Sequence, residues 1–212
     1  AQDCAKMYGF LGKNVQMEYT HYDKKGKVSM VNTQKVVQLE NRKDTLVATL
    51  DVRSVNEKGK ELYNNTLPMK CYAGTVYMDL RSMVPPQQNT KQSGDVQIEI
   101  SGSDLVFPPA MKAGQSLPDA EMGMIMRLGT LQMMNTRYYI KNRKVEGEES
   151  VTTPAGTYKA LKISYDFGYK FIGTHNLHTL YWYAPEVGMI KSVSYDKKGN
   201  EDSRIELTKF VK

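Results

Sequence analysis

Residues 161–171 alternate strictly between two kinds of side chain, and no other feature of the sequence constrains the fold as much. The first set is Leu161, Ile163, Tyr165, Phe167, Tyr169 and Phe171, and the second is Lys162, Ser164, Asp166, Gly168 and Lys170. Because successive side chains of a β-strand point to opposite faces, this pattern predicts a strand with one apolar and one wet face. A strand of about 11 residues extends for roughly 36 Å, which favours a broad, curled sheet.

Shorter alternations occur elsewhere along the chain, and long helical periodicity is nearly absent. Residues 15–20, 46–52 and 96–100 each alternate between apolar and polar side chains. This pattern predicts an all-β protein built on an antiparallel sheet.

Turn motifs separate these segments. The pentapeptide Tyr-Asp-Lys-Lys-Gly occurs at 22–26 and again at 195–199, and 56–59, 41–44 and 153–156 have similar turn chemistry. Asp initiates a tight turn through its side chain, and Gly accepts the positive φ near its end, so each motif predicts a hairpin tip. The repeated pentapeptide fits either an internal repeat or a recurrence of turn residues, and the unmatched flanks favour the second interpretation.

The middle of the chain differs from both ends. Residues 85–95 are polar without periodicity and predict a mobile loop. Residues 103–130 are apolar but contain Pro108, Pro109 and Pro118, which leave room for short helical turns at most. We therefore expect one all-β domain over 1–212, a curled meander forming an open or incomplete barrel, with 103–130 as an insertion against its concave side.

Composition excludes several classes of protein. The net charge is +6, from 29 basic and 23 acidic residues. The basic residues cluster at turns instead of forming a continuous face, so we expect no nucleic-acid partner. No apolar run approaches the roughly 18 residues that cross a bilayer, so we expect no transmembrane segment.

Cys4 and Cys71 are the only cysteines. An even count fits one disulfide in an oxidising compartment, and two buried free thiols are the alternative. The opening residues Ala1 to Cys4 resemble a mature end left by removal of a signal peptide. Both observations predict a secreted or periplasmic protein of the bacterial envelope.

Signals for catalysis and metal binding are weak. His175 and His178 point to opposite faces if they lie on one strand, which disfavours a metal site. The acidic residues of 146–149 follow Arg143 and Lys144, and this favours a solvated charge ladder over paired catalytic carboxylates. The nucleophile-elbow and phosphate-loop motifs are missing from the sequence. We expect no enzymatic activity, no metal and no cofactor.

The most informative excess is in 13 Met and 14 Tyr. Methionine adapts to irregular apolar partners, and Tyr combines apolar area with a polar tip. These residues either fill a core or line a pocket for an apolar ligand. The candidate ligand wall comprises Met122, Met124, Met126, Met134, Tyr165, Phe167, Tyr169 and Trp182.

Two segments carry a family resemblance. Residues 143–158, Arg-Lys-Val-Glu-Gly-Glu-Glu-Ser-Val-Thr-Thr-Pro-Ala-Gly-Thr-Tyr, and 181–191, Tyr-Trp-Tyr-Ala-Pro-Glu-Val-Gly-Met-Ile-Lys, resemble secreted bacterial proteins of unknown function labelled TapB-like. The resemblance implies a strongly curved antiparallel sheet, similar to the half-barrels of periplasmic lipoprotein carriers. It also implies an envelope location and a hydrophobic concavity, with no catalytic residues to transfer.

These observations favour non-enzymatic binding of a lipid or another apolar molecule on the concave face of the sheet. The alternative is an envelope protein that binds a protein partner through its sheet edge or basic hairpin tips. A hydrolase with a polar pocket around His175, His178 or Glu148 is a third, less favoured class.

Overall fold

A computed structural model describes residues 2–83, 96–171 and 173–212. Two short helical segments precede the first strand, and a third follows β5. The elements are α1 Gln2–Met7, η1 Gly9–Leu11, β1 Gln16–Asp23, β2 Val28–Arg42, β3 Thr45–Asn56, β4 Glu61–Tyr72, β5 Thr75–Asp79, η2 Leu80–Met83, β6 Val96–Gly102, β7 Asp104–Phe107, β8 Ala120–Leu128, β9 Leu131–Thr153, β10 Gly156–Phe171, β11 Gly173–Ala184, β12 Gly188–Tyr195 and β13 Glu201–Val211.

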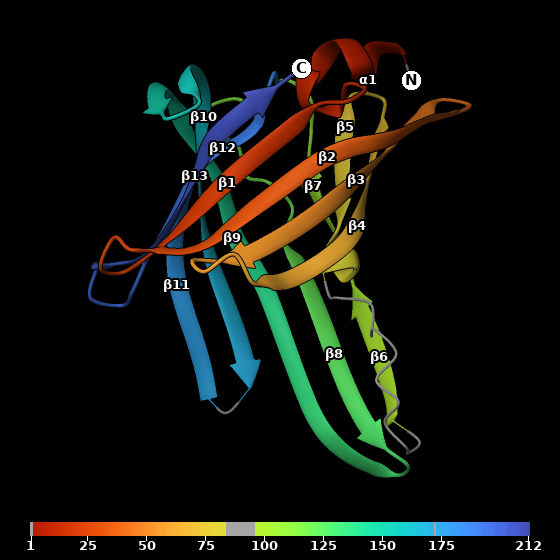
Figure 1. Cartoon of the computed structure of the whole chain (residues 1–212), viewed down its shortest axis with the longest axis vertical. Helices are drawn as coiled ribbons and strands as arrows, with labels where there is room; N and C mark the ends of the chain where they lie inside the picture. Colours follow the sequence, from red (N-terminus) through yellow and green to blue (C-terminus); the bar gives the residue numbers. More distant parts are fainter. Residues whose placement is uncertain (1, 84–95, 172) are drawn as a thin grey trace.

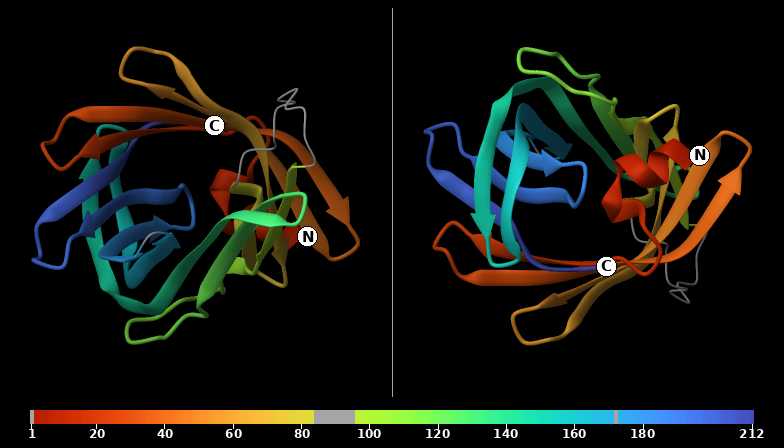
Figure 2. Two further views of the ribbon diagram at one scale, coloured as in Figure 1. Left: turned by 90° about the horizontal axis from the view of Figure 1, so that it is seen from below. Right: turned by 90° about the horizontal axis from the view of Figure 1, so that it is seen from above.

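The strands form one sheet in the order β6-β8-β9-β10-β11-β12-β13-β1-β2-β3-β4-β5-β7, and every neighbouring pair is antiparallel. Because β1 pairs with β13, the first and last strands lie side by side in the middle of the sheet. The sheet curls until its two edges approach, and the end-on views show strands around almost the whole circumference (Figure 2). The prediction of an all-β incomplete barrel is confirmed.

The hairpin tips confirm the turn chemistry read from the sequence. Asp23 Oδ1 accepts hydrogen bonds from the backbone N–H groups of Lys25 and Lys27, at 2.8 and 2.9 Å. Asn56 and Asp196 make the same pair of contacts two and four residues further on. The glycine that ends the first turn has a φ of +72°. One side-chain carboxylate or amide therefore organises each of these three tips.

The prediction for residues 103–130 was wrong. These residues do not form an insertion over the concave side, because β7 and β8 are strands of the barrel wall itself. The prolines at 108, 109 and 118 lie between the two strands, where they remove no ladder hydrogen bond. The polar loop expected at 85–95 lies outside the described residues.

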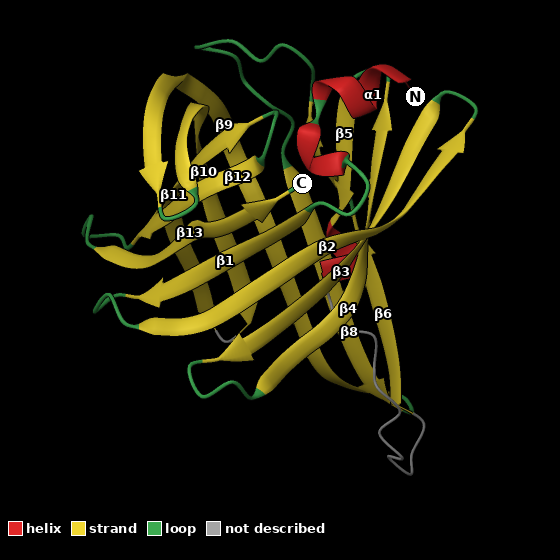
Figure 3. Ribbon diagram, turned by 45° about the horizontal axis from the view of Figure 1, so that its top comes forward, coloured by secondary structure: helices red, strands yellow, loops and turns green. Residues whose placement is uncertain are grey.

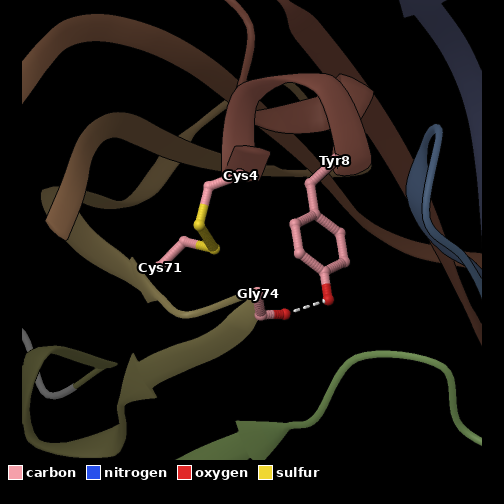
Figure 4. Close-up of a disulfide and its surroundings, with 4 residues drawn as sticks. All are labelled: Cys4, Tyr8, Cys71 and Gly74. Carbon is pink, nitrogen blue, oxygen red and sulfur yellow. Dashed lines mark hydrogen bonds between the residues drawn. A yellow bond between two sulfur atoms is a disulfide. The ribbon is translucent and has the colours of Figure 1, made fainter. Parts of the chain in front are cut away.

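The core fills the end of the barrel that α1 and η1 cover (Figure 3). Tyr8, Phe10 and Leu11 follow α1 and are buried in the core. A disulfide joins Cys4 to Cys71 with an S–S distance of 2.05 Å, and the Tyr8 hydroxyl donates to the Gly74 carbonyl at 2.5 Å (Figure 4). The N-terminal segment is thus held to the hairpin between β4 and β5 by one covalent and one polar contact.

The two edge strands β6 and β7 meet at a seam that is not closed by a hydrogen-bonded ladder. Only Ser103 separates these strands in the sequence, although they lie at opposite ends of the strand order. Above β8, residues 114–117 run beside β9: the Gly114 N–H donates to the Val145 carbonyl, and the Val145 N–H donates to the Gln115 carbonyl. The remaining gap, between this segment and β7, is bridged by side chains.

Arg143 forms the principal polar bridge across the seam. Its Nη1 donates to the carbonyl of Val106 on β7, at 2.9 Å, and to the carbonyl of Pro118, at 2.8 Å. Its guanidinium carbon lies 5.1 Å from the centre of the Phe107 ring. Only 3% of Arg143 is exposed, and burial lowers the pKa of its guanidinium. The expectation that Arg143 belongs to a solvated charge ladder was wrong, because its side chain points inward and meets the edge of β7.

We expect reduction of the Cys4–Cys71 disulfide to lower the free energy of unfolding by about 4 kcal/mol, since the bond closes a long loop in the unfolded chain. Urea denaturation with and without reductant measures this change. A Cys4→Ala/Cys71→Ala double variant is the control, and its stability should not respond to reductant. Equal stability of the oxidised and reduced protein would contradict the expectation.

Replacing Arg143 by Met should lower the free energy of unfolding by about 1–3 kcal/mol, because two buried carbonyls lose their donor. The matched control is Lys144→Met on the exposed face of the same strand, where a change within about 0.5 kcal/mol is expected. Hydrogen exchange should also accelerate in β7 of the Arg143 variant only. Similar losses in both variants would show that Arg143 does not bridge the seam.

Candidate functional site

Strand pairing gathers most of the predicted ligand wall on one side of the sheet. Met122 lies opposite Tyr138, and Met126 lies opposite Met134. Across the next ladder, Tyr138 lies opposite Tyr169. We call this set the methionine–aromatic face; it comprises Met122, Met124, Met126, Met134, Tyr138, Phe167 and Tyr169.

This face continues the inner side of the barrel. Ile163 pairs with Val145, and both are almost completely buried in the core. Phe167 and Tyr169 follow Ile163 at even spacings along β10, so they lie on the same side of the sheet. The core and the methionine–aromatic face are therefore two parts of one continuous surface.

The methionine–aromatic face is only half-buried, because the strands that carry it are longer than the strands of the opposite wall. The lower parts of β8, β9, β10 and β11 extend past the level at which the hairpin of β3 and β4 ends (Figure 1). Within the face, the rings of Tyr138 and Phe167 are 6.5 Å apart, and Tyr169 stacks on His175 at 4.6 Å. Thioether and aromatic groups thus remain together at a partly open surface.

The opposite side of the same strands is mostly polar, although Ile125 of β8 also lies on it. Arg127 forms an ion pair with Glu99 at 3.6 Å, and the Tyr139 hydroxyl donates to the Asn176 side chain. Tyr139 lies across Gly168, where any β-carbon would overlap its ring. Gly168 therefore has a steric role, since it lets a large side chain cover the backbone of β10.

Trp182 does not belong to the methionine–aromatic face. It lies opposite Lys162 and Lys191 in the two adjacent ladders, on the outer side of the barrel. The two ammonium groups lie 5.5 and 5.9 Å from the centre of its ring, and its Nε1 donates to Glu149 at 2.5 Å. Its placement in the predicted ligand wall was wrong, because adjacent residues of a strand face opposite ways and Trp182 alternates with the inward Tyr181 and Tyr183.

The two histidines of β11 face opposite ways, as predicted from their spacing. His175 stacks on the inner face, and His178 Nδ1 lies 3.1 Å from Asp166 Oδ1 on the outer face. Within residues 2–83, 96–171 and 173–212, no three His, Cys, Asp or Glu side chains are placed to hold a metal ion.

A second inward group contains Tyr165 of the predicted ligand wall, and its other members were not singled out from the sequence. We call it the polar belt; it comprises His21, Asn32, Gln34, Ser54, Tyr165, Thr179, Ser192 and Ser194. Each member shares its side of the sheet with a core residue; for example, Asn32 lies opposite the buried Tyr19. Isolated Ser, Thr and Asn within alternating strands gave no signal, because the same residues are ordinary on a wet face.

Hydrogen bonds link members of the polar belt on both sides of the barrel. Gln34 donates to Asn32 Oδ1 at 3.0 Å, and Asn32 donates to Ser54 Oγ at 2.8 Å. Thr179 Oγ1 lies 3.0 Å from Ser194 Oγ. Satisfied pairs of this kind lower the cost of placing amides and hydroxyls inside the barrel.

Burial disfavours the charged forms of His21 and of three tyrosines on the inner side. Burial lowers the pKa of His21 to about 4, so its imidazole is neutral at pH 7. Burial also raises the pKa values of Tyr19 and Tyr181, and it raises that of Tyr165, where the hydroxyls of Ser192 and Thr179 oppose the effect in part. The belt therefore offers neutral donors and acceptors.

Comparison with known proteins identifies relatives of this arrangement. A family model described as DUF3108-like matches residues 12–207. No curated protein matches the sequence. The TapB-like label suggested by the sequence motifs is not confirmed by these matches.

Two crystal structures share the fold. One is an inferred exported protein with a YmcC-like fold from Bacteroides fragilis, 18% identical, with a TM-score of 0.77 over 95% of this chain and 97% of that one. The other is an inferred lipoprotein from Parabacteroides distasonis, 20% identical, with a TM-score of 0.75 over 97% of this chain and 99% of that one. At these identities the likeness extends to the fold alone.

We expect the stability of the protein to fall as the pH drops below the pKa of an unfolded histidine, near 6.5. Unfolded His21 takes up a proton there, whereas the folded side chain stays neutral until about pH 4. Its contribution is complete above about pH 6.5 and should fall by about 1–2 kcal/mol on going to about pH 5. Urea denaturation at both pH values measures the loss, and His21→Gln should reduce it by that amount. An unchanged pH dependence in the variant would contradict the burial of a neutral His21.

Proposed function

The chain belongs to the DUF3108-like family, and from that premise we propose that it is an exported, non-enzymatic protein that holds an apolar molecule on its methionine–aromatic face. The observation that carries this proposal is the exposure of that face. Thioethers and aromatic rings that continue the barrel core remain half-buried where β8–β11 extend beyond β3 and β4. Apolar side chains gathered at a partly open surface are typical of a site of interaction.

The side chains of the methionine–aromatic face suit an apolar ligand of variable shape. Methionine is unbranched and polarisable, so Met122, Met124 and Met126 on one strand can adjust to different partners. Each Å² of apolar area removed from water contributes roughly 25 cal/mol, so affinity would come from contact area. Tyr138 and Tyr169 add rigid rings whose hydroxyls can remain in water.

The composition of this face supports binding without chemical conversion. Its side chains are thioethers, a phenyl ring and phenols, and the imidazole of His175 beside them stacks on the Tyr169 ring, which is not the hydrogen-bonded hydroxyl–imidazole geometry used for nucleophilic attack. The His178–Asp166 pair lies on the opposite, exposed side of the sheet. A bound molecule would therefore be carried or stored.

No described helix is long and apolar enough to cross a bilayer. Two observations support an envelope location. The two structural neighbours are inferred to be an exported protein and a lipoprotein. The Cys4–Cys71 disulfide requires an oxidising compartment to persist.

The dye N-phenyl-1-naphthylamine, which is uncharged and fluoresces in apolar surroundings, tests the proposal. We expect the protein to bind it and Met124→Asp to weaken binding by about tenfold or more, because a carboxylate would be desolvated against the dye. The matched control is Ile125→Asp, since Ile125 is equally half-buried but faces the opposite side of β8. Its affinity should stay within about twofold of the original protein.

Absence of dye binding, or equal weakening by both variants, would reject the methionine–aromatic face as a binding site. Binding to envelope proteins that falls steeply with salt, without dye binding, would instead favour the protein-interaction alternative.

A further inference from the structure

We propose that the molecule held on the methionine–aromatic face is amphipathic, with an uncharged head rich in hydroxyl or amide groups that contacts the polar belt. This inference rests on the proposed function and specifies the class of ligand. It follows from the position, the hydrogen-bonding capacity and the charge of the belt.

The belt and the methionine–aromatic face are continuous. Tyr165 lies between Ile163 of the core and Phe167 of the methionine–aromatic face, on the same side of β10. Tyr165 lies opposite Thr179, and Thr179 lies opposite Ser194. An apolar chain lying along Phe167 and Tyr169 would therefore have its upper end next to the phenol and hydroxyls of the belt.

The far wall of the barrel presents matching groups. Asn32, Gln34 and Ser54 form a hydrogen-bonded series across β2 and β3. His21 is half-buried beside them on β1, and its ring nitrogens make no hydrogen bond with the described residues. A core sealed from all ligands would gain stability from apolar side chains at these positions, since buried polar groups contribute little net energy even when paired.

Charge limits the kind of head that fits. His21 is neutral at pH 7, and the belt contains no carboxylate. The nearby cation Arg143 already donates to two carbonyls at the seam. A cationic head would find no counter-charge in the belt, and its desolvation would be uncompensated. Hydroxyls and amides both donate and accept, so they complement Asn, Gln, Ser, Thr and Tyr side chains directly.

Two probes with the same tail and different heads test the inference. Octyl β-glucoside and octyltrimethylammonium, both below their micelle concentrations, are titrated by calorimetry in about 0.5 M salt, which screens the net charge of +6. We expect the glucoside to bind at least about fivefold more tightly, because its hydroxyls gain hydrogen bonds that each contribute about 1 kcal/mol.

Thr179→Val locates the head, because it removes one belt hydroxyl and keeps the side-chain shape. The matched control is Thr20→Val: Thr20 is also buried and also pairs with a neighbouring hydroxyl, that of Thr208 at 3.2 Å, but it faces outward. We expect Thr179→Val to weaken glucoside binding by about three- to tenfold while leaving dye binding unchanged. Thr20→Val should change neither. Ser194→Ala, at a half-buried position of the belt, gives a second reading if Thr179→Val fails to fold.

The outcomes separate this inference from the proposed function. If the unmodified protein does not bind the dye, both the proposed function and the assignment of the head to the polar belt are rejected. Dye binding with no preference for the glucoside head, or with equal effects of the Thr179 and Thr20 variants, rejects the head assignment and leaves an apolar ligand. The belt would then be a structural network of paired or hydrated side chains.

Discussion

Closure of the barrel depends on how the two edges of the sheet are satisfied at the seam. An open edge leaves N–H and C=O groups free to pair with other chains. Here β7 is only four residues long, and the Arg143 guanidinium supplies a donor to its Val106 carbonyl. Phe107, next along β7, stacks on Tyr183 at 5.1 Å and so reaches the facing wall of the core. One charged and one aromatic side chain thereby connect β7 to the rest of the barrel at the seam.

The strands of the sheet differ greatly in length, and this shapes the inner surface. β9 has 23 residues and β5 has five, although each is paired with a neighbour on both sides. The long strands carry the inward alternation beyond the level of the short ones. Alternate residues of these strands point inward along their whole length. They form the core where an opposite wall covers them, and they form a partly open apolar surface beyond the end of that wall.

The sequence was sufficient for the regular features of the fold. Asp23, Asn56 and Asp196 set their hairpins through local contacts, and Leu161 to Phe171 predicted the strand at the centre of the site. Sequence patterns did not predict the elements whose formation depends on contacts with distant parts of the chain. The prolines of residues 103–130 argued against a regular element there, yet β8 forms part of the wall because it pairs with β6 and β9.

The side of the sheet that a residue faces was harder to predict than the strand itself. Arg143 looked solvated because its neighbours are charged, yet its partners are carbonyls brought near by closure of the seam. Trp182 looked like part of an apolar wall, yet it lies outside under two lysine side chains that cover its ring. Long cationic side chains can bury an aromatic ring while their ammonium groups remain in water, so burial alone does not identify the inner face. The polar belt is the converse case, since its Ser, Thr and Asn residues match a wet face in type but point inward. In a barrel of this kind, the residues of the inner surface are identified by counting every second residue along each strand from a known core residue. A ligand inside the barrel would contact the side chains identified in this way.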